Sequence, residues 1–246
     1  VDKTVRNGMT CWYSRPAMFD PAAIRAITLD LDDTLWPVRP VIERAEAQLQ
    51  AWLAQHAPRT AALSPERRRE LRRQSALDHA DRAHDLGWLR REAIRACLLE
   101  AGDDPALAEP AYELFNDWRQ RVDFFEGHLQ ALQRLAERYP LIALSNGTAD
   151  VFRTEAAPYF RAAVSAREVG VSKPDPRIFA VAVAHAGVPA EQVLHVGDDA
   201  HHDVLGARAA GMPVVWLQDA SREWSHEGAA PWRLSHLGQL CDHLLT

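Results

Sequence analysis

The sequence predicts an α/β protein, in which helices cover a parallel sheet and an all-helical block is inserted into the chain. Two observations support this fold class. Helical stretches alternate with short apolar runs, a rhythm typical of parallel βαβ units, and we expect strands within 26–35, at 141–144, near 162–165, at 193–196 and at 213–217. A long interval, residues 37–125, shows helical spacing only. The helical block therefore interrupts the α/β part directly after its first strand.

The first expected strand ends in acidic residues. Its apolar run is too short for a free-standing helix and indicates a buried parallel strand, which delivers Asp30 and Asp32 at its carboxyl end, where open α/β sheets bind ligands. The Thr34 hydroxyl is placed to brace them. Burying carboxylates together is unfavourable unless a cation or a proton compensates. The stretch therefore predicts a divalent metal ion and one carboxyl group with a raised pKa, although an acidic end that caps the next helix is the alternative interpretation.

Residues 37–125 predict a small helical bundle with short connections. Val41, Ala45 and Leu49 keep helical spacing, Ser64 followed by proline starts a further helix, and Gly102 stops another. Because this block follows the first strand, we expect it to lie as a lid over the strand's carboxyl end.

After Gly127 the chain returns to the α/β pattern and is expected to end in a closing helix over 234–245. The predicted domain division is a core formed by 1–36 and 126–246, of which 1–15 is a tail, and a helical domain formed by 37–125.

Composition limits the function further. Hydrophobic residues make up 47% of the 246 residues and charged residues 25%, which is ordinary for a soluble globular protein. The net charge of -6 argues against a nucleic-acid binder, and no apolar run is long enough to span a membrane. Cys11, Cys97 and Cys241 are widely spaced, which argues against a disulfide framework or zinc site and favours the cytoplasm. Monomer and dimer both remain open.

Four short motifs carry residue types suited to chemistry, and three of them follow expected strands. They are Asp30-x-Asp32-x-Thr34, Ser145-Asn146-Gly147, Lys173 in Val-Ser-Lys-Pro-Asp, and Gly197-Asp198-Asp199 with Asp203 four residues on. Alone, each has a simpler interpretation as a turn, a surface charge or a helix cap. Lysine is otherwise found only at Lys3, so Lys173 is the one amine available to a site. Together, the order and placement of the motifs indicate a single site.

These four motifs, in this order, resemble those of the haloacid dehalogenase-like hydrolase superfamily, and the resemblance extends from about residue 24 to the end. It implies a Rossmann-like three-layer core, with the helical block as a C1-type cap. More narrowly, LDLDDTLW, LSNGT, SKPDP and HVGDDAHHDVLGARAAGM look like bacterial phosphatases of flavin mononucleotide (FMN) and of related riboflavin-pathway phosphates such as ribitylaminouracil phosphate. Many phosphatases share the core motifs, and fold-level analogy does not identify a substrate.

The resemblance implies a Mg²⁺-dependent phosphatase that acts on small phosphate monoesters. Asp30 would be the nucleophile that forms an aspartyl phosphate, and Asp32 would be the general acid and base. Ser145 and Lys173 would bind the transferring oxygens, and Asn146 would also bind substrate. Mg²⁺ would be held by Asp30, the Asp32 backbone carbonyl and Asp198. Asp199 and Asp203 are expected to reach the metal through water or to serve as alternative ligands.

Substrate choice is expected to depend on the cap. Trp36 and Arg39 are predicted to bind substrate, because aromatic rings stack on planar groups and arginines pair with anions. Arg82, Trp88 and Arg90 are further candidates. His201 and His202 are not expected to be ligands, because adjacent side chains at a helix start point apart.

Other members of the superfamily remain as alternatives. A dehalogenase needs neither a second catalytic aspartate nor a metal, so Asp32 and Asp198 argue against it. A phosphonatase requires a cap lysine, and 37–125 contains none. A phosphomutase shares the same core. A catalytically silent binding protein would be expected to lose the nucleophile or the acid, and here both are present.

Overall fold

The sheet has six parallel strands. The computed structural model describes residues 19–218 and 223–245, so the predicted tail, with Cys11, lies outside the described residues. The strands are arranged in the order β3-β2-β1-β4-β5-β6. Their bounds are β1 Ala26–Leu29, β2 Leu141–Ser145, β3 Phe160–Ser165, β4 Val193–Gly197, β5 Val214–Leu217 and β6 Trp232–Leu234. Because β1 lies between β2 and β4, the motifs that follow these three strands meet at one edge of the sheet.

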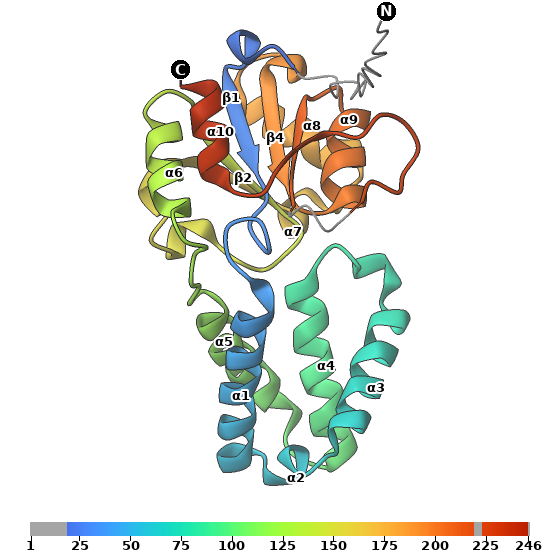
Figure 1. Ribbon diagram of the computed structural model, residues 1–246. Coiled ribbons are helices and arrows are strands. Elements are labelled where there is room, and N and C mark those ends of the chain that lie inside the picture. Colours follow the sequence, from blue (N-terminus) through green and yellow to red (C-terminus); the bar gives the residue numbers. More distant parts are fainter. Residues whose placement is uncertain (1–18, 219–222, 246) are drawn as a thin grey trace, which may run out of the picture.

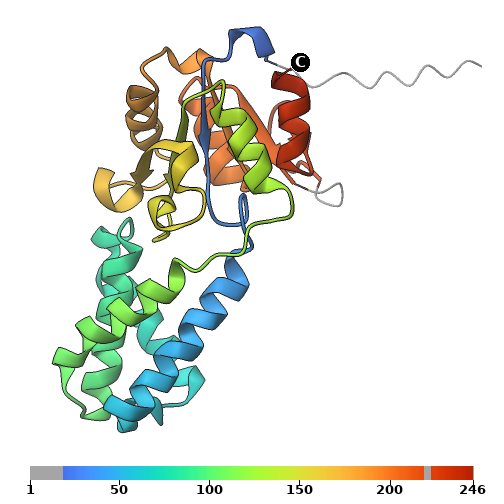
Figure 2. The same ribbon diagram turned by 90° about the vertical axis from the view of Figure 1, so that its left-hand side faces the viewer.

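Helices cover both faces of this sheet, as Figures 1 and 2 show. Leu132 of one helix and Leu240 of another are buried on the first face, whereas Phe179 and Ala207 are buried on the second. The helices of the core are α6 His128–Ala136, α7 Ala166–Val169, α8 Pro176–Ala186, α9 Gly206–Ala209 and α10 Leu237–Leu244. α6 and α10 form the first outer layer, and α8 and α9 form the second. The Rossmann-like three-layer core is therefore confirmed.

The inserted block is all helical and has its own core. α1 packs against α5, α3 against α4, and α4 against α5. Their bounds are α1 Val38–His56, α2 Pro58–Ala61, α3 Pro65–Asp78, α4 Leu86–Ala101 and α5 Ala108–Arg119. The predicted end signals act as expected, because the Ser64 hydroxyl accepts the Arg67 N–H and Gly102 ends α4 with a φ of 76°. In Figure 1 this block lies below the carboxyl ends of the strands.

The end of the chain differs from the expectation. A closing helix was expected over 234–245, but α10 begins at Leu237 and the short edge strand β6 precedes it, with Leu234 paired to Leu217. Three residues are too few to show the alternation that predicts a strand. The pairing with β5, which is remote in sequence, forms this strand.

The two chain crossings between the core and the helical block lie side by side. The Phe125 N–H donates to the Leu35 carbonyl at 3.0 Å, and the Trp36 and Phe124 rings meet edge to face with centroids 5.1 Å apart. The two crossings are therefore held to each other where the core meets the helical block.

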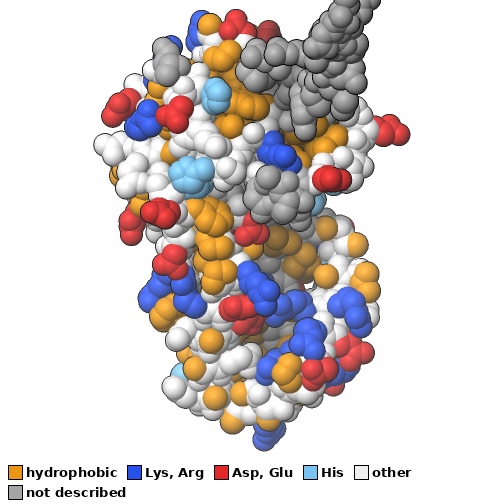
Figure 3. Space-filling model, viewed as in Figure 1, with side chains coloured by type: hydrophobic (Ala, Val, Ile, Leu, Met, Phe, Trp, Pro, Cys, Tyr) orange, Lys and Arg blue, Asp and Glu red, His pale blue; other side chains and the backbone are white. Residues whose placement is uncertain are grey.

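The described surface of the helical block carries charges of both signs. Arg67 of α3 pairs with Glu70 and Glu100, and Arg72 pairs with Glu46. Figure 3 shows blue and red side chains mixed over the lower half of the molecule. Within residues 19–218 and 223–245, no helix combines the length and the apolar character needed to cross a membrane.

Candidate active site

The chain turns sharply after β1, and this turn collects the first acids. Asp33 adopts a left-handed backbone with φ 58°, and its side chain accepts the Val38 N–H at the start of α1. Asp30 is 7% exposed. The Thr34 hydroxyl lies 3.4 Å from Asp30 Oδ2 and 3.2 Å from Asp198 Oδ1, so it braces Asp30 and Asp198 rather than Asp30 and Asp32.

Lys173 lies between two buried carboxylates. Its Nζ donates to Asp30 Oδ1 at 2.5 Å and to Asp203 Oδ1 at 2.7 Å, and the residue is 3% exposed. Burial alone would lower the pKa of Lys173, but the attraction of Asp203 and Asp30 outweighs it and raises that pKa. The amine is therefore a fixed cation at the nucleophile candidate.

Asp203 belongs to a buried network that the sequence motifs predict only in part. His195 of β4 is fully buried, with Nε2 3.1 Å from Asp203 Oδ1 and Nδ1 2.9 Å from the Thr28 hydroxyl. Burial lowers the pKa of His195. Burial also opposes ionisation of Asp203, but Lys173 and the His195 hydrogen bond lower its pKa overall. The polar His195 within the apolar strand Val-Leu-His-Val was the signal available in the sequence.

The donor set fits a hard divalent cation. Carboxylate oxygens of Asp30, Asp198 and Asp203 lie within 4.8 Å of one another, and carboxylates are the ligands that Mg²⁺ prefers. One ammonium faces these three carboxylates. Burial raises the pKa of Asp30 despite Lys173, and burial with repulsion from Asp203 raises that of Asp198 to about 7. Burial therefore disfavours the ionised forms of Asp30 and Asp198, and a bound divalent cation would favour them.

Asp32 points to the helical block rather than to the other acids. The Arg119 Nη2 group, at the end of α5, lies 2.6 Å from Oδ1 and 2.5 Å from Oδ2 of Asp32. The Trp36 indole N–H donates to Oδ1 at 2.9 Å. Because Trp36 is fully buried and edge-on to Phe124, its ring has no free face for the stacking predicted from the sequence. Nothing in the sequence marked Arg119 as a site residue, because it is one of many arginines.

The segment after β2 forms a polar corner beside Asp32. The Ser145 hydroxyl accepts the Gly147 N–H at 2.9 Å, and Ser145 is 4% exposed. A Cβ at Gly147 would lie 2.6 Å from Asp32 Oδ2. Asn146 was predicted to bind substrate, but its amide donates to the Lys173 carbonyl at 3.0 Å and accepts the Lys173 N–H at 2.7 Å. Asn146 therefore fixes the backbone of Lys173.

Other predicted site residues are placed elsewhere. The Arg39 side chain is 87% exposed and pairs with Glu43. Asp199, expected near the metal, instead caps the π-helical turn Ala200–Leu205 by accepting the N–H groups of His201 and His202. Those two histidines lie outside the metal-competent cluster found among the described residues.

The further cap candidates contact their own helical block. The Arg82 guanidinium lies 5.3 Å from the centroid of the Trp88 ring. Arg90 pairs with Glu46 of α1 and lies 4.2 Å from the Phe115 ring centroid. These contacts stabilise the block, and they involve none of the clustered aspartates.

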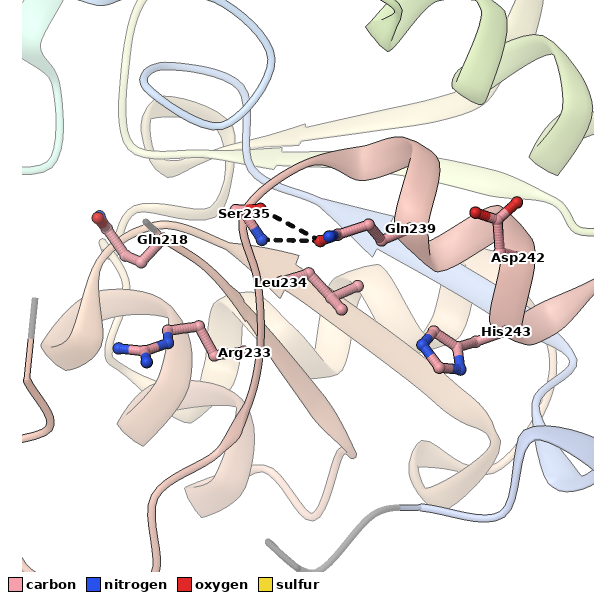
Figure 4. A pocket seen from close by; sticks show the side chains of 7 residues that line it. All are labelled: Gln218, Arg233, Leu234, Ser235, Gln239, Asp242 and His243. Atoms are coloured by element: carbon pink, nitrogen blue, oxygen red, sulfur yellow. Dashed lines mark hydrogen bonds between the residues drawn. The ribbon is translucent and has the colours of Figure 1, made fainter. Parts of the chain in front are cut away.

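Two cavities lie around the site, and Asp198 lines only the first of them. One, of about 520 Å³, is lined by Asp198 and Asp33. The other, of about 240 Å³, lies between core and cap, and Gly147 of the core and Tyr112 of α5 contribute to its walls. A third cavity, of about 320 Å³, lies over β6 (Figure 4). None of the clustered aspartates lines this third cavity, and the Ser235 N–H donates to Gln239 Oε1 in its wall.

Comparison with known proteins agrees with this architecture. The family model described as haloacid dehalogenase-like hydrolase matches residues 24–211. The Escherichia coli K12 protein named 5-amino-6-(5-phospho-D-ribitylamino)uracil phosphatase YigB is 32% identical over 225 residues, which cover 88% of this chain and 94% of that protein. A phosphoserine phosphatase from Thermus thermophilus is 32% identical over 160 residues, covering 63% and 64% of the two chains.

Among solved structures, a 2-haloacid dehalogenase from Pseudomonas syringae pv. Tomato DC3000 is similar to this chain with a TM-score of 0.85 and 35% identity, over 90% of this chain and 98% of that one. The family match covers the inserted helices and the core from β1 to the end of α9. The chain belongs to the haloacid dehalogenase-like hydrolase family.

Proposed function

We propose that the protein is a phosphatase that hydrolyses small phosphate monoesters through an aspartyl phosphate on Asp30. The observation that carries the proposal is the contact between Asp30 and the buried Lys173 ammonium, beside a carboxylate cluster suited to a divalent cation. Phosphoryl transfer requires a nucleophile held among positive charges, since the transferring oxygens carry negative charge.

The residues divide the chemistry as follows. An Asp30 oxygen attacks phosphorus, and the leaving alcohol oxygen takes a proton from the Asp32 carboxyl group. Asp32 then accepts a proton from the water that cleaves the Asp30–phosphoryl bond, so both side chains return to their starting states. Lys173 and the Ser145 hydroxyl bind the transferring oxygens. A Mg²⁺ ion held by Asp30, the Asp32 carbonyl and Asp198 would neutralise charge on the phosphoryl group.

The cavity beside Gly147 is the proposed position of the leaving group. The general acid must lie next to the leaving oxygen, and Gly147 lies against Asp32 Oδ2. The cavity lies between core and cap with Gly147 in its wall, and its lining is mostly polar, including Tyr112, Asn116 and Thr148. This lining suits a hydroxylated or amide-bearing organic group rather than an apolar one.

We further propose that the substrate is a riboflavin-pathway phosphate, either FMN or the ribitylaminouracil phosphate. The likeness to YigB over nearly its whole length supports this choice. Both molecules carry a hydroxylated chain and a ring with amide groups, which match the polar walls of the cavity. The likeness to a solved 2-haloacid dehalogenase supports the second candidate, a dehalogenase. Asp32 and the aspartate cluster favour the phosphatase.

A substrate panel tests both levels of the proposal. The purified protein with Mg²⁺ is assayed for phosphate release from FMN, ribitylaminouracil phosphate, sugar phosphates, nucleotides and phosphoserine, and for halide release from 2-chloropropionate. Asp30→Asn is the control for a contaminating phosphatase. We expect kcat/KM to be highest for the two riboflavin-pathway compounds. Equal values for sugar phosphates would remove the substrate assignment, conversion of a sugar phosphate into its isomer would indicate a mutase, and halide release without phosphate release would replace the phosphatase by a dehalogenase.

A further inference from the structure

Arg119 forms an ion pair with Asp32 that joins the cap to the core, and the Asp32 side chain is 21% exposed. Arg119 is the last residue of α5 and is 2% exposed, and its partner Asp32 lies in the turn after β1. Such a pair is weak support for stability, because the hydration that the buried guanidinium loses offsets much of the attraction. The pair therefore calls for a role other than holding the fold together.

The geometry of the guanidinium also argues against a purely structural role. A single nitrogen, Nη2, contacts both oxygens of Asp32, whereas Nη1 is buried and has no hydrogen-bond partner among the described residues. A guanidinium placed for stability would pair its N–H groups, since a buried unpaired donor is unfavourable. Here the contact with the two Asp32 oxygens is made while Nη1 is left unpaired.

The contacts of Asp32 fix its direction from the cap side. Besides Arg119, the Trp36 indole donates to Oδ1 just before α1 begins. Asp32 is thus held by the last residue of the final cap helix and by the segment that enters the first one. The Arg119 Nη2 lies 3.5 Å from the position of a Cβ on Gly147, at the polar corner that also holds the Ser145 hydroxyl. The orientation of the carboxyl group therefore depends on where α5 ends.

We propose that Arg119 is a positioning residue for the general acid Asp32, through which the cap sets the orientation of the carboxyl group that protonates the leaving alcohol. This inference rests on the proposed phosphatase function. It concerns proton delivery from Asp32 to the leaving oxygen and not the attack by Asp30. Loss of Arg119 should therefore impair substrates in proportion to their need for a proton.

The test compares two esters on two variants. An alkyl phosphate has a poor leaving group that needs the proton, whereas p-nitrophenyl phosphate leaves as a stable anion. For Arg119→Met we expect kcat to fall about 10²-fold with the alkyl ester. The fall with the nitrophenyl ester should be at least about tenfold smaller, and Asp32→Asn should show the same pattern. Arg121→Met is the matched control, because this arginine is exposed and lies over the Trp118 ring, and it should behave as the wild type.

A double-mutant cycle separates positioning from a general loss of structure. In the Asp32→Asn background, Arg119→Met should reduce alkyl-ester turnover by no more than about threefold, because the residue it positions is already lost. If Arg119→Met does not fold by circular dichroism, the two-ester comparison is made on Arg119→Lys, which keeps the charge. Equal losses for both esters, or full additivity in the cycle, would overturn the role of Arg119. A wild-type protein inactive on both esters would contradict the phosphatase function, and this inference with it.

Discussion

Replacing Lys173 by methionine should destabilise the protein as well as stop turnover. The ammonium lies 2.5 Å from Asp30 and 2.7 Å from Asp203, and all three groups are buried. Methionine keeps the length of the side chain but leaves two carboxylates without their cation. Removing one partner of a buried ion pair costs about 3–5 kcal/mol. For a chain of this size, each kcal/mol lowers the midpoint of thermal unfolding by about 2–4 °C, so we expect a decrease of about 6–20 °C.

The assay is thermal unfolding followed by circular dichroism in metal-free buffer, with urea unfolding as a second measure. The double variant Lys173→Met/Asp203→Asn is the internal test, because it also removes one of the two carboxylates that Lys173→Met leaves without a cation. Its free energy of unfolding should be about 0.5–3 kcal/mol higher than the value expected from adding the two single effects. Arg69→Met is the control for losing a cation, since Arg69 is an exposed partner of Glu66, and its midpoint should not change measurably. A Lys173→Met midpoint within about 2 °C of the wild type would refute the reasoning.

Three further predictions concern the acid, the metal and the cap. Gly147→Ala should lower kcat about 10²-fold without unfolding the protein, because the new Cβ would lie 2.6 Å from an Asp32 oxygen that Arg119 holds in place; steady-state kinetics at the wild-type level would contradict this. EDTA should abolish phosphate release and Mg²⁺ should restore it, and full activity in EDTA would indicate a reaction without metal. Burial would raise the pKa of Glu46, but Arg90 and Arg72 outweigh it and hold that pKa below its ordinary value of 4.5. The unfolded chain therefore binds the proton first, and the stabilisation present above pH 4.5 is lost as the pH falls through the folded value. Urea unfolding should show Glu46→Gln to be less stable than the wild type at neutral pH, with the difference vanishing in acid; a difference independent of pH would exclude this role.

Much of the fold could be predicted because its signals are local. Apolar runs marked five of the strands, Ser64 and Gly102 marked helix ends, and the order of the elements placed the helical block after β1. β6 could not be predicted, because three residues show no period and their pairing partner is remote in sequence.

The site divides in the same way. Asp30, Lys173 and Asp198 lie in motifs, and the structure brings them together. Trp36 was expected to stack on substrate, but in the structure the Phe124 ring packs against it. Whether an aromatic ring near a site keeps a free face depends on such packing, which the sequence does not show. Arg119 is 87 residues from Asp32, so only the fold could reveal their contact.

Trapping the intermediate tests the role of Asp30 most directly. The protein is mixed with Mg²⁺ and a substrate that it hydrolyses, the reaction is quenched in acid within the first turnover, and the digested peptides are examined by mass spectrometry. We expect a phosphoryl group on the peptide that contains Asp30 in the wild type, and none in Asp30→Asn. A protein that releases phosphate without a phosphorylated peptide, or with the group on another residue, would contradict the nucleophilic role of Asp30.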